Sequence, residues 1–142
     1  MATFNKFNSF VEDLAEKVHK LDTDVLKVAL SNTLPVNTNT VLANITQIAA
    51  ANGYVAGGNA ANPATSSAQT SGTYKLVLPD VTFTAAGGLI GPFRYAVLYN
   101  DTPTAPADPL IGWYDYGTNL TITDGNSFTV DFDASAGVLT LV

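Results

Sequence analysis

The stretch Phe128-Thr129-Val130-Asp131-Phe132-Asp133 decides the fold class of this chain. Apolar and polar residues alternate strictly along it, with the apolar side chains at the even positions and the polar ones at the odd positions. Because successive side chains of a β-strand point to opposite faces, this spacing predicts a strand with one face in a core and one face in solvent.

The same kind of signal extends over most of the sequence. From Val25 onward, short runs rich in Val, Thr, Tyr and Phe are separated by clusters of Gly, Pro, Asn and Asp, which is typical of antiparallel strands joined by turns. We predict strands at residues 25–30, 41–48, 74–78, 81–84, 93–99, 110–116, 120–123, 128–132 and 138–142. Such a series favours an antiparallel β-sandwich or a jelly-roll-like barrel.

Helical periodicity is present only in the first segment. Apolar residues at positions 4, 7, 11, 14, 18 and 21 recur at steps of three and four, and Ser9 with Glu12 has the spacing of a capping box. We therefore predict a helix over residues 5–20. The expected protein is a single mainly β domain of residues 1–142, with one N-terminal α-helix followed by a sandwich over 25–142.

Two connections in the predicted sandwich are unusual. Residues 56–72 contain no side chain larger than Ala that could anchor in a core, so we expect a long loop or a flexible arm. Residues 100–109 place three prolines at intervals of three, which favours a stiff, extended connector. Both segments are candidates for contacts with a partner.

Composition excludes several classes of protein. Charged residues make up only 13% of the 142 residues and the net charge is −6; residues 76–142 carry Arg94 alone against seven Asp. Such a field repels phosphate, so we expect no nucleic acid partner. The sequence has no Cys, which excludes disulfides and thiol chemistry. We see no secretory signal and no apolar run long enough to span a membrane, and expect a product assembled in the cytoplasm of its host.

The sequence carries few groups suited to catalysis. His19 is the only histidine, and its place near the end of a charged helix predicts a solvated residue rather than a general base. Glu12 and Glu16 are expected to pair with nearby lysines. No nucleophile motif is present, so we expect no enzyme, no cofactor and no small-molecule substrate.

Two clusters allow a second interpretation. Asp131 and Asp133 could hold Ca²⁺ with a third Asp, but acidic side chains on a solvent face explain the same pattern without a metal, and we predict no metal site. Trp113, with Tyr95 and Tyr99 in the preceding strand, could form an exposed aromatic row that binds sugar. Packing of Trp113 in the core explains the same residues and is the interpretation we favour.

Protein binding remains as the expected function. Lys and Glu are scarce, and protein interfaces are depleted in both residue types. Surfaces of Thr, Asn and Ala lose little side-chain entropy on contact. The composition therefore suits a protein that contacts copies of itself or a repeated lattice.

Five segments together resemble the small structural proteins of tailed bacteriophages: FNKFNSF (4–10), KVALSNTLP (27–35), NGYVAGG (52–58), GPFRYAVLYND (91–101) and LIGWYDYG (110–117). In size and character the chain is most similar to head decoration, or cement, proteins. This resemblance implies a virion protein on the outer surface of the head, which binds the lattice of the major capsid protein as a dimer or trimer. A tail or neck component and a carbohydrate-binding sandwich are the alternatives.

The resemblance supplies no catalytic residues, and we place the partner-binding surface on the helix end and the two unusual connections. The residues expected in this surface are Phe4, Phe7, Phe10, Asn59, Asn62, Pro63, Thr65, Pro103 and Pro106.

Overall fold

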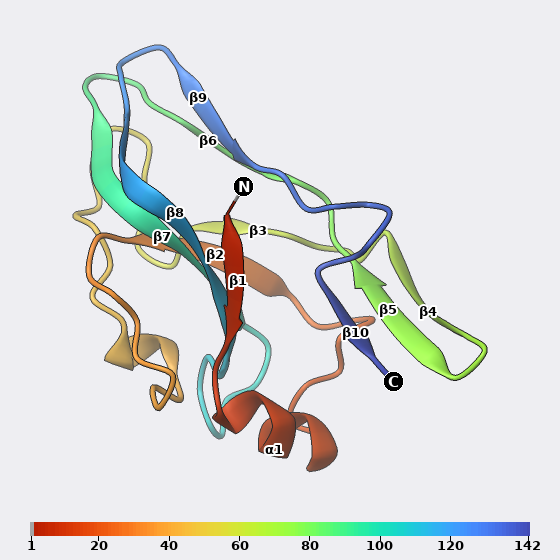
Figure 1. Ribbon diagram of the computed structural model, residues 1–142. Helices are drawn as coiled ribbons and strands as arrows, with labels where there is room; N and C mark the ends of the chain where they lie inside the picture. Colours follow the sequence, from red (N-terminus) through yellow and green to blue (C-terminus); the bar gives the residue numbers. More distant parts are fainter. Residues whose placement is uncertain (1) are drawn as a thin grey trace.

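A computed structural model describes residues 2–142 and shows a mainly β protein with antiparallel sheets and one α-helix (Figure 1). One layer is a five-stranded sheet in the order β1-β8-β7-β2-β3. Its strands are β1 (Thr3–Lys6), β2 (Leu26–Ser31), β3 (Asn59–Ala60), β7 (Ile90–Asn100) and β8 (Leu110–Ile122).

Two smaller sheets lie against this layer. One has the order β10-β5-β4 and the other pairs β6 with β9; the layers do not close into a barrel. The strands are β4 (Ser66–Thr70), β5 (Thr73–Val77), β6 (Val81–Thr84), β9 (Ser127–Val130) and β10 (Leu139–Leu141). The predicted sandwich-like fold is confirmed, and the strict alternation at residues 128–133 is retained, since Val130 and Phe132 are buried while Thr129 and Asp131 are exposed.

Apolar side chains gather on both faces of the five-stranded sheet. The larger cluster fills the space between the layers and includes Leu30, Phe83, Phe93 and Leu98, each fully buried. A second cluster covers the opposite face; its members are Phe7, Ala29, Leu42, Ile45, Tyr95, Val97, Tyr99, Leu110 and Trp113. Burial on both faces explains why β7 is almost continuously apolar rather than alternating.

The helix is shorter than predicted. α1 spans Ser9–Ala15, because residues 3–6 instead form β1 and pair antiparallel with β8, which places Phe4 opposite Tyr114. The chain leaves the helix at Lys17, whose φ of 67° lies in the left-handed region. The predicted capping box is also wrong. Ser9 is the first helical residue, the N-cap Asn8 makes no side-chain cap bond, and the buried Ser9 hydroxyl has no hydrogen-bond partner among the described residues.

The predicted strand at residues 41–48 is a turn of 3-10 helix, η1 (Leu42–Asn44). The Oδ1 atom of Asn44 accepts hydrogen bonds from the backbone N–H groups of Thr40 and Val41, at 3.1 and 3.2 Å, which closes the turn. Leu42 and Ile45, three residues apart, are thereby buried on the second cluster. A three-residue spacing suits a helical turn and not a strand.

Both unusual connections have more structure than the sequence predicted. Residues 56–72 contain β3 and β4, and Ala61 is fully buried, so this segment is not a plain loop. Residues 100–109 do not extend but double back. Thr104 bridges to Ala107, and the N–H of Asn100 donates to the carbonyl of Pro109 at 3.0 Å, which closes the connection between β7 and β8.

Candidate protein-binding groove

Two strand edges border an open groove on one side of the sandwich. β1 pairs only with β8 and β10 pairs only with β5, so in the part of the chain that the structure describes each has one edge without a partner strand. Figure 1 shows β1 and β10 on the same side of the molecule, and both run from the top of the view towards the bottom. The groove therefore lies where the two layers of the sandwich separate.

The floor of the groove consists of two adjoining hollows that share Phe4 and Val138. The first, of about 690 Å³, lies beside the start of β1. It is lined mainly by aromatic and acidic side chains, among them Phe4, Tyr114, Tyr116, Phe128, Asp131 and Asp133. The second, of about 320 Å³, lies beside the end of β1 and is lined by Phe4, Lys6, Phe10, Val11, Ile111 and residues 138–141.

The aromatic rings of the first hollow are fixed by contacts with one another. The ring of Tyr114 lies 5.0 Å from that of Phe4 and 5.9 Å from that of Phe132, and the ring of Tyr116 lies 5.2 Å from that of Phe128. Burial raises the pKa of the Tyr114 phenol, and burial together with the Asp131 carboxylate raises the pKa of Tyr116 to about 12. Both hydroxyl groups therefore stay protonated at neutral pH and can donate hydrogen bonds.

The second hollow is predominantly apolar. Leu139 and Leu141 are half-buried, and Val11 of α1 is 50% exposed beside them. Beneath these side chains lie Phe10 and Ile111, which belong to the core between the layers. A ligand in this hollow would cover apolar surface that water now contacts.

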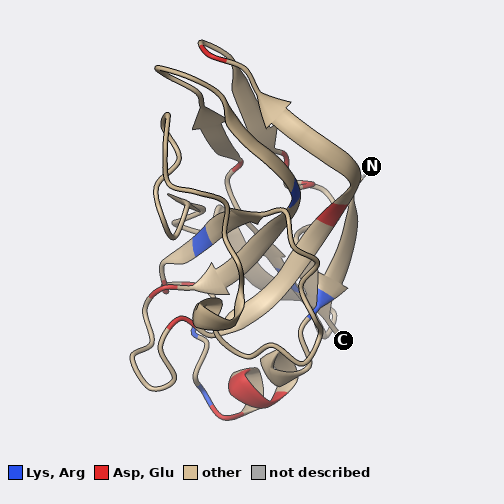
Figure 2. Cartoon of the chain, turned by 90° about the vertical axis from the view of Figure 1, so that its left-hand side faces the viewer, with Lys and Arg blue, Asp and Glu red and all other residues tan. Residues whose placement is uncertain are grey.

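Charge is distributed unevenly along the groove. Asp131 stands at the aromatic end and Lys6 at the apolar end, and neither forms an ion pair with another of the described residues. The ion pairs of residues 2–142 lie elsewhere: Lys20 with Asp22, Lys27 with Asp101 and Arg94 with Asp115. In the last pair, Arg94 lowers the pKa of the Asp115 carboxyl. Figure 2 shows how sparse charged residues are on the rest of the chain.

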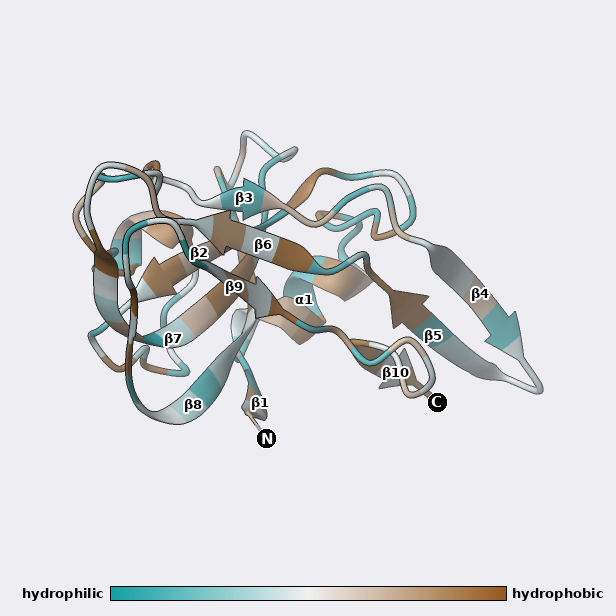
Figure 3. Ribbon diagram, turned by 90° about the horizontal axis from the view of Figure 1, so that it is seen from above, coloured by the Kyte–Doolittle hydropathy of each residue, from teal (hydrophilic) through white to brown (hydrophobic). Residues whose placement is uncertain are grey.

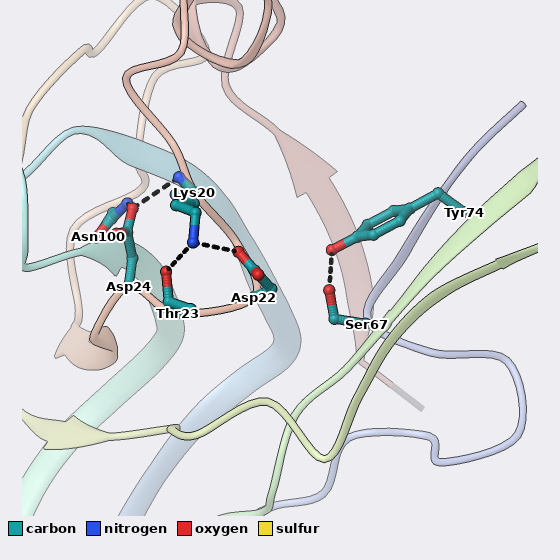
Figure 4. A network of polar contacts seen from close by, with 7 residues as sticks. All are labelled: Lys20, Asp22, Thr23, Asp24, Ser67, Tyr74 and Asn100. Atoms are coloured by element: carbon teal, nitrogen blue, oxygen red, sulfur yellow. Dashed lines mark hydrogen bonds and ion pairs between the residues drawn. The ribbon is translucent and has the colours of Figure 1, made fainter.

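A hairpin of β4 and β5 extends away from the body of the molecule (Figure 3). Its outer strand, Ser66–Thr70, has the sequence SSAQT, and four of its five residues are exposed. β4 pairs with β5 alone, so its other edge has no partner strand among the described residues. Across the hairpin, the hydroxyl groups of Ser67 in β4 and Tyr74 in β5 lie 2.8 Å apart (Figure 4).

A buried polar cluster joins the chain after α1 to the end of β7. The side-chain amide of Asn100 donates to Oδ2 of Asp24 at 2.6 Å and to Nδ1 of His19 at 3.2 Å, and the same carboxylate oxygen accepts from the Lys20 N–H at 2.7 Å (Figure 4). His19 is 5% exposed, so the prediction of a solvated helix residue is wrong. Burial lowers its pKa to about 4, although Asp24 opposes this.

The three phenylalanines near the start of the chain, predicted to bind a partner, are mostly buried in the structure. Phe7 and Phe10 are 0% and 3% exposed, so the prediction that they face a partner is wrong for this fold. Phe7 packs on Trp113, and Phe10 packs between the layers beside His19, with ring centroids 4.6 and 5.3 Å apart. Phe4 lines both parts of the groove, and Phe10 lies beneath the second hollow.

The other predicted interface residues fall in two separate places. The first place is the chain around β3. Asn59 is half-buried there, and its side chain donates to the Thr82 carbonyl at 2.8 Å, which joins β3 to β6. Asn62 is also half-buried, whereas Pro63 and Thr65 are exposed before β4. In the second, Pro103 is half-buried and Pro106 exposed, both in the loop between β7 and β8. The structure does not bring these residues together with the groove.

Trp113 is a core residue, as we favoured. It is 6% exposed, as is Tyr95, and Tyr99 is 1% exposed. The hydroxyl of Tyr99 donates to the Gly57 carbonyl at 2.7 Å, which fixes the loop that covers this face. The three rings therefore do not form the exposed row that sugar binding at these positions would need.

The carboxylates near the end of the chain act on the backbone. Asp133 accepts hydrogen bonds from the N–H groups of Ser135 and Ala136, at 2.7 and 2.9 Å, and these bonds lower the pKa of its carboxyl. Within residues 2–142, no three His, Asp or Glu side chains are grouped so that they could hold a metal ion. None of the helices in this range is long and apolar enough to cross a membrane.

Sequence reasoning missed the groove itself. Phe4 and Lys6 alternate with Thr3 and Asn5, which is a strand-like signal, but the helical spacing of the following residues obscured it. Comparisons with protein-family models, with curated proteins and with solved structures found no match.

Proposed function

We propose that this protein is a non-enzymatic structural component of a bacteriophage virion, which binds the outer capsid lattice as a decoration or cement protein. The observation that carries the proposal is the projecting β4–β5 hairpin with its open edge at Ser66–Thr70. Edge strands of soluble proteins are usually protected by charged residues, by proline or by a covering segment. None of these occurs within the five residues of β4, so the edge is suited to pairing with another protein.

The chemistry of the hairpin supports binding to a protein surface rather than to a small molecule. Ser, Ala and Thr, four of the five residues of β4, have small side chains that can pack against another surface at low entropic cost. They also avoid the desolvation penalty that burial of a charged group would carry. Many weak contacts of this kind, repeated over identical copies, add up on an ordered lattice.

The assignment to a virion head is supported by the sequence resemblance and by the excess of acidic residues. A net charge of −6 disfavours a position against the packaged genome and suits an outer one. On this proposal the protein bridges neighbouring capsid subunits and adds buried area where the shell is under internal pressure.

Mass spectrometry of virions from the phage that carries this gene tests the proposal. Heads and tails are separated, and the copy number of this chain is measured against that of the major capsid protein. A copy number comparable with that of the capsid protein in the head fraction is expected. Recovery only in the tail fraction would indicate a tail or neck component, and absence from both fractions would overturn the virion assignment.

A further inference from the structure

We propose that the groove between β1 and β10 receives an extended segment of a partner protein, which pairs antiparallel with the free edge of β1 and packs its apolar side chains against Leu139 and Leu141. This proposal rests on the proposed function only in its general form, that the chain binds another protein. It names the site and the chemistry of the bound segment.

The strand edge gives the first argument. β1 pairs with β8 over Thr3–Lys6, and none of these four residues makes a backbone hydrogen bond to any other described segment. An edge of four residues presents backbone donors and acceptors over roughly 14 Å at the usual rise of a strand. An added strand satisfies these groups and gains affinity from main-chain hydrogen bonds.

The hollows give the second argument. An added strand directs alternate side chains to one face, and beside β1 that face meets two adjoining hollows of about 690 and 320 Å³. The side chains of an added strand can enter these hollows while its backbone stays close enough to pair with β1. The segment is therefore one in which every second residue is apolar or aromatic.

Charge determines which end of an antiparallel segment is acidic and which is basic. Asp131 lies with Ala2 at the start of β1, and Lys6 lies at its end. A strand antiparallel to β1 begins near Lys6 and finishes near Asp131. The complementary segment therefore has an acidic residue at its N-terminal end and a basic residue at its C-terminal end.

A second copy of this chain does not fit the groove. Its projecting edge strand, Ser66–Thr70, carries small polar side chains, which would leave the hollows unfilled. Two copies that each carry a net charge of −6 also repel one another. A different protein with an alternating apolar segment satisfies both requirements.

The probe is the synthetic peptide acetyl-Glu-Thr-Val-Thr-Val-Thr-Lys-amide, whose charged end residues share one face with the valines, titrated to millimolar concentration into the ¹⁵N-labelled full chain. We expect NMR shifts at the amides of β1 and β10 and slower hydrogen exchange in β1. The same peptide with N-methylated valines keeps its side chains but loses backbone donors, and should bind at least about tenfold more weakly, the loss of one or two hydrogen bonds.

The charge argument is tested with the reversed peptide, in which Lys stands first and Glu last. Binding about fivefold weaker than that of the first peptide is expected from two exposed charge contacts. Asp131→Lys should abolish this preference, because both ends of the groove are then basic and each peptide makes one favourable and one unfavourable charge contact. Asp124→Lys is the matched control, because this exposed Asp lies in the turn between β8 and β9, outside the groove, and should leave the preference unchanged.

The alternative outcomes each overturn the proposal. Shifts confined to β4, equal binding of both peptides, or no binding of either at millimolar concentration would show that the groove does not receive such a strand. A dimer of the free protein with β1 already protected from exchange would show that a second copy occupies it. The virion assignment is tested separately by the copy number in heads, so the two proposals can fail independently.

Discussion

The side-chain amide of Asn100 donates a hydrogen bond to Nδ1 of His19 across 3.2 Å, although the two residues lie 81 positions apart. Because Nδ1 accepts, the neutral imidazole carries its proton on Nε2, and this atom is buried without a hydrogen-bond partner among the described residues. A second proton would have to displace the Asn100 amide. The arrangement thus holds His19 in its neutral form.

Stability should therefore fall between pH 7 and pH 5. The folded pKa of His19 is lowered from 6.5 to about 4, so the unfolded chain binds the proton first as the pH decreases. The stabilisation is complete above pH 6.5 and is lost as the pH falls towards 4, with a decrease of about 2 kcal/mol by pH 5. Urea unfolding at a series of pH values measures this slope.

The matched variant for the pH series is His19→Phe, which keeps a ring against Phe10 and leaves the bond between Asn100 and Asp24 in place. Its free energy of unfolding should change little between pH 7 and pH 5. The lowered pKa values of Asp115 and Asp133 act only at lower pH, since their stabilisation is lost as the pH falls through values below 3.8. An equal slope in both proteins would contradict the role of His19.

Gly58→Ala should prevent β3 from pairing with β2. Gly58 has a φ of +70°, and an added Cβ would lie 1.7 Å from the carbonyl oxygen of Val28. Because that oxygen belongs to a central strand, the backbone must separate to relieve the overlap. We expect a loss of several kcal/mol, more than about 3, measured by chemical denaturation.

Gly72→Ala separates the effect of the clash from that of backbone strain. Gly72 has a similar φ of +82°, but an added Cβ would meet nothing within 4 Å. The cost should be about 1 kcal/mol, which is the strain of the left-handed conformation alone. Equal losses in the two variants would mean that the approach of Gly58 to Val28 has no energetic consequence.

The difference in burial between two apolar residues near the start of the chain predicts very different effects of their truncation. Phe7 is fully buried and Val11 is 50% exposed at the groove. Phe7→Ala should lower the free energy of unfolding by about 3–5 kcal/mol, whereas Val11→Ala should change it by about 0.5 kcal/mol or less. Thermal unfolding of both variants measures this difference. A Phe7→Ala variant as stable as the unmodified protein would show that Phe7 is not part of the core.

The sequence predicted strands well where the alternation typical of a strand was the only periodic signal. At Phe128–Phe132 local alternation and tertiary burial agree, and the predicted strand is present. At residues 3–7 the two disagree. The apolar spacing there is that of a helix, but it is also compatible with a strand followed by a short helix, which is what the chain forms. Pairing of β1 with β8 decides between these structures, and pairing over such a sequence separation leaves no local signal.

The candidate site depended even more on contacts that are distant in sequence. The groove combines Phe4 of β1, Tyr114 of β8 and Leu139 of β10. Each is an ordinary apolar residue of a strand. What makes them a site is the separation of the two layers at β1 and β10, and no single segment encodes it.

Trp113 gives an optical test of the second cluster. It is the only Trp and is 6% exposed, with its ring centroid 4.6 Å from that of Phe7. Its fluorescence should be blue-shifted and quenched by acrylamide several-fold less than that of free N-acetyltryptophanamide.

Phe7→Leu removes the covering ring but keeps an apolar side chain, so quenching should increase. Phe128→Leu is the control, since Phe128 packs against the other cluster, and it should leave quenching unchanged. Efficient quenching in the unmodified protein would contradict the buried position of Trp113 and would reopen the possibility of an exposed aromatic row on this face.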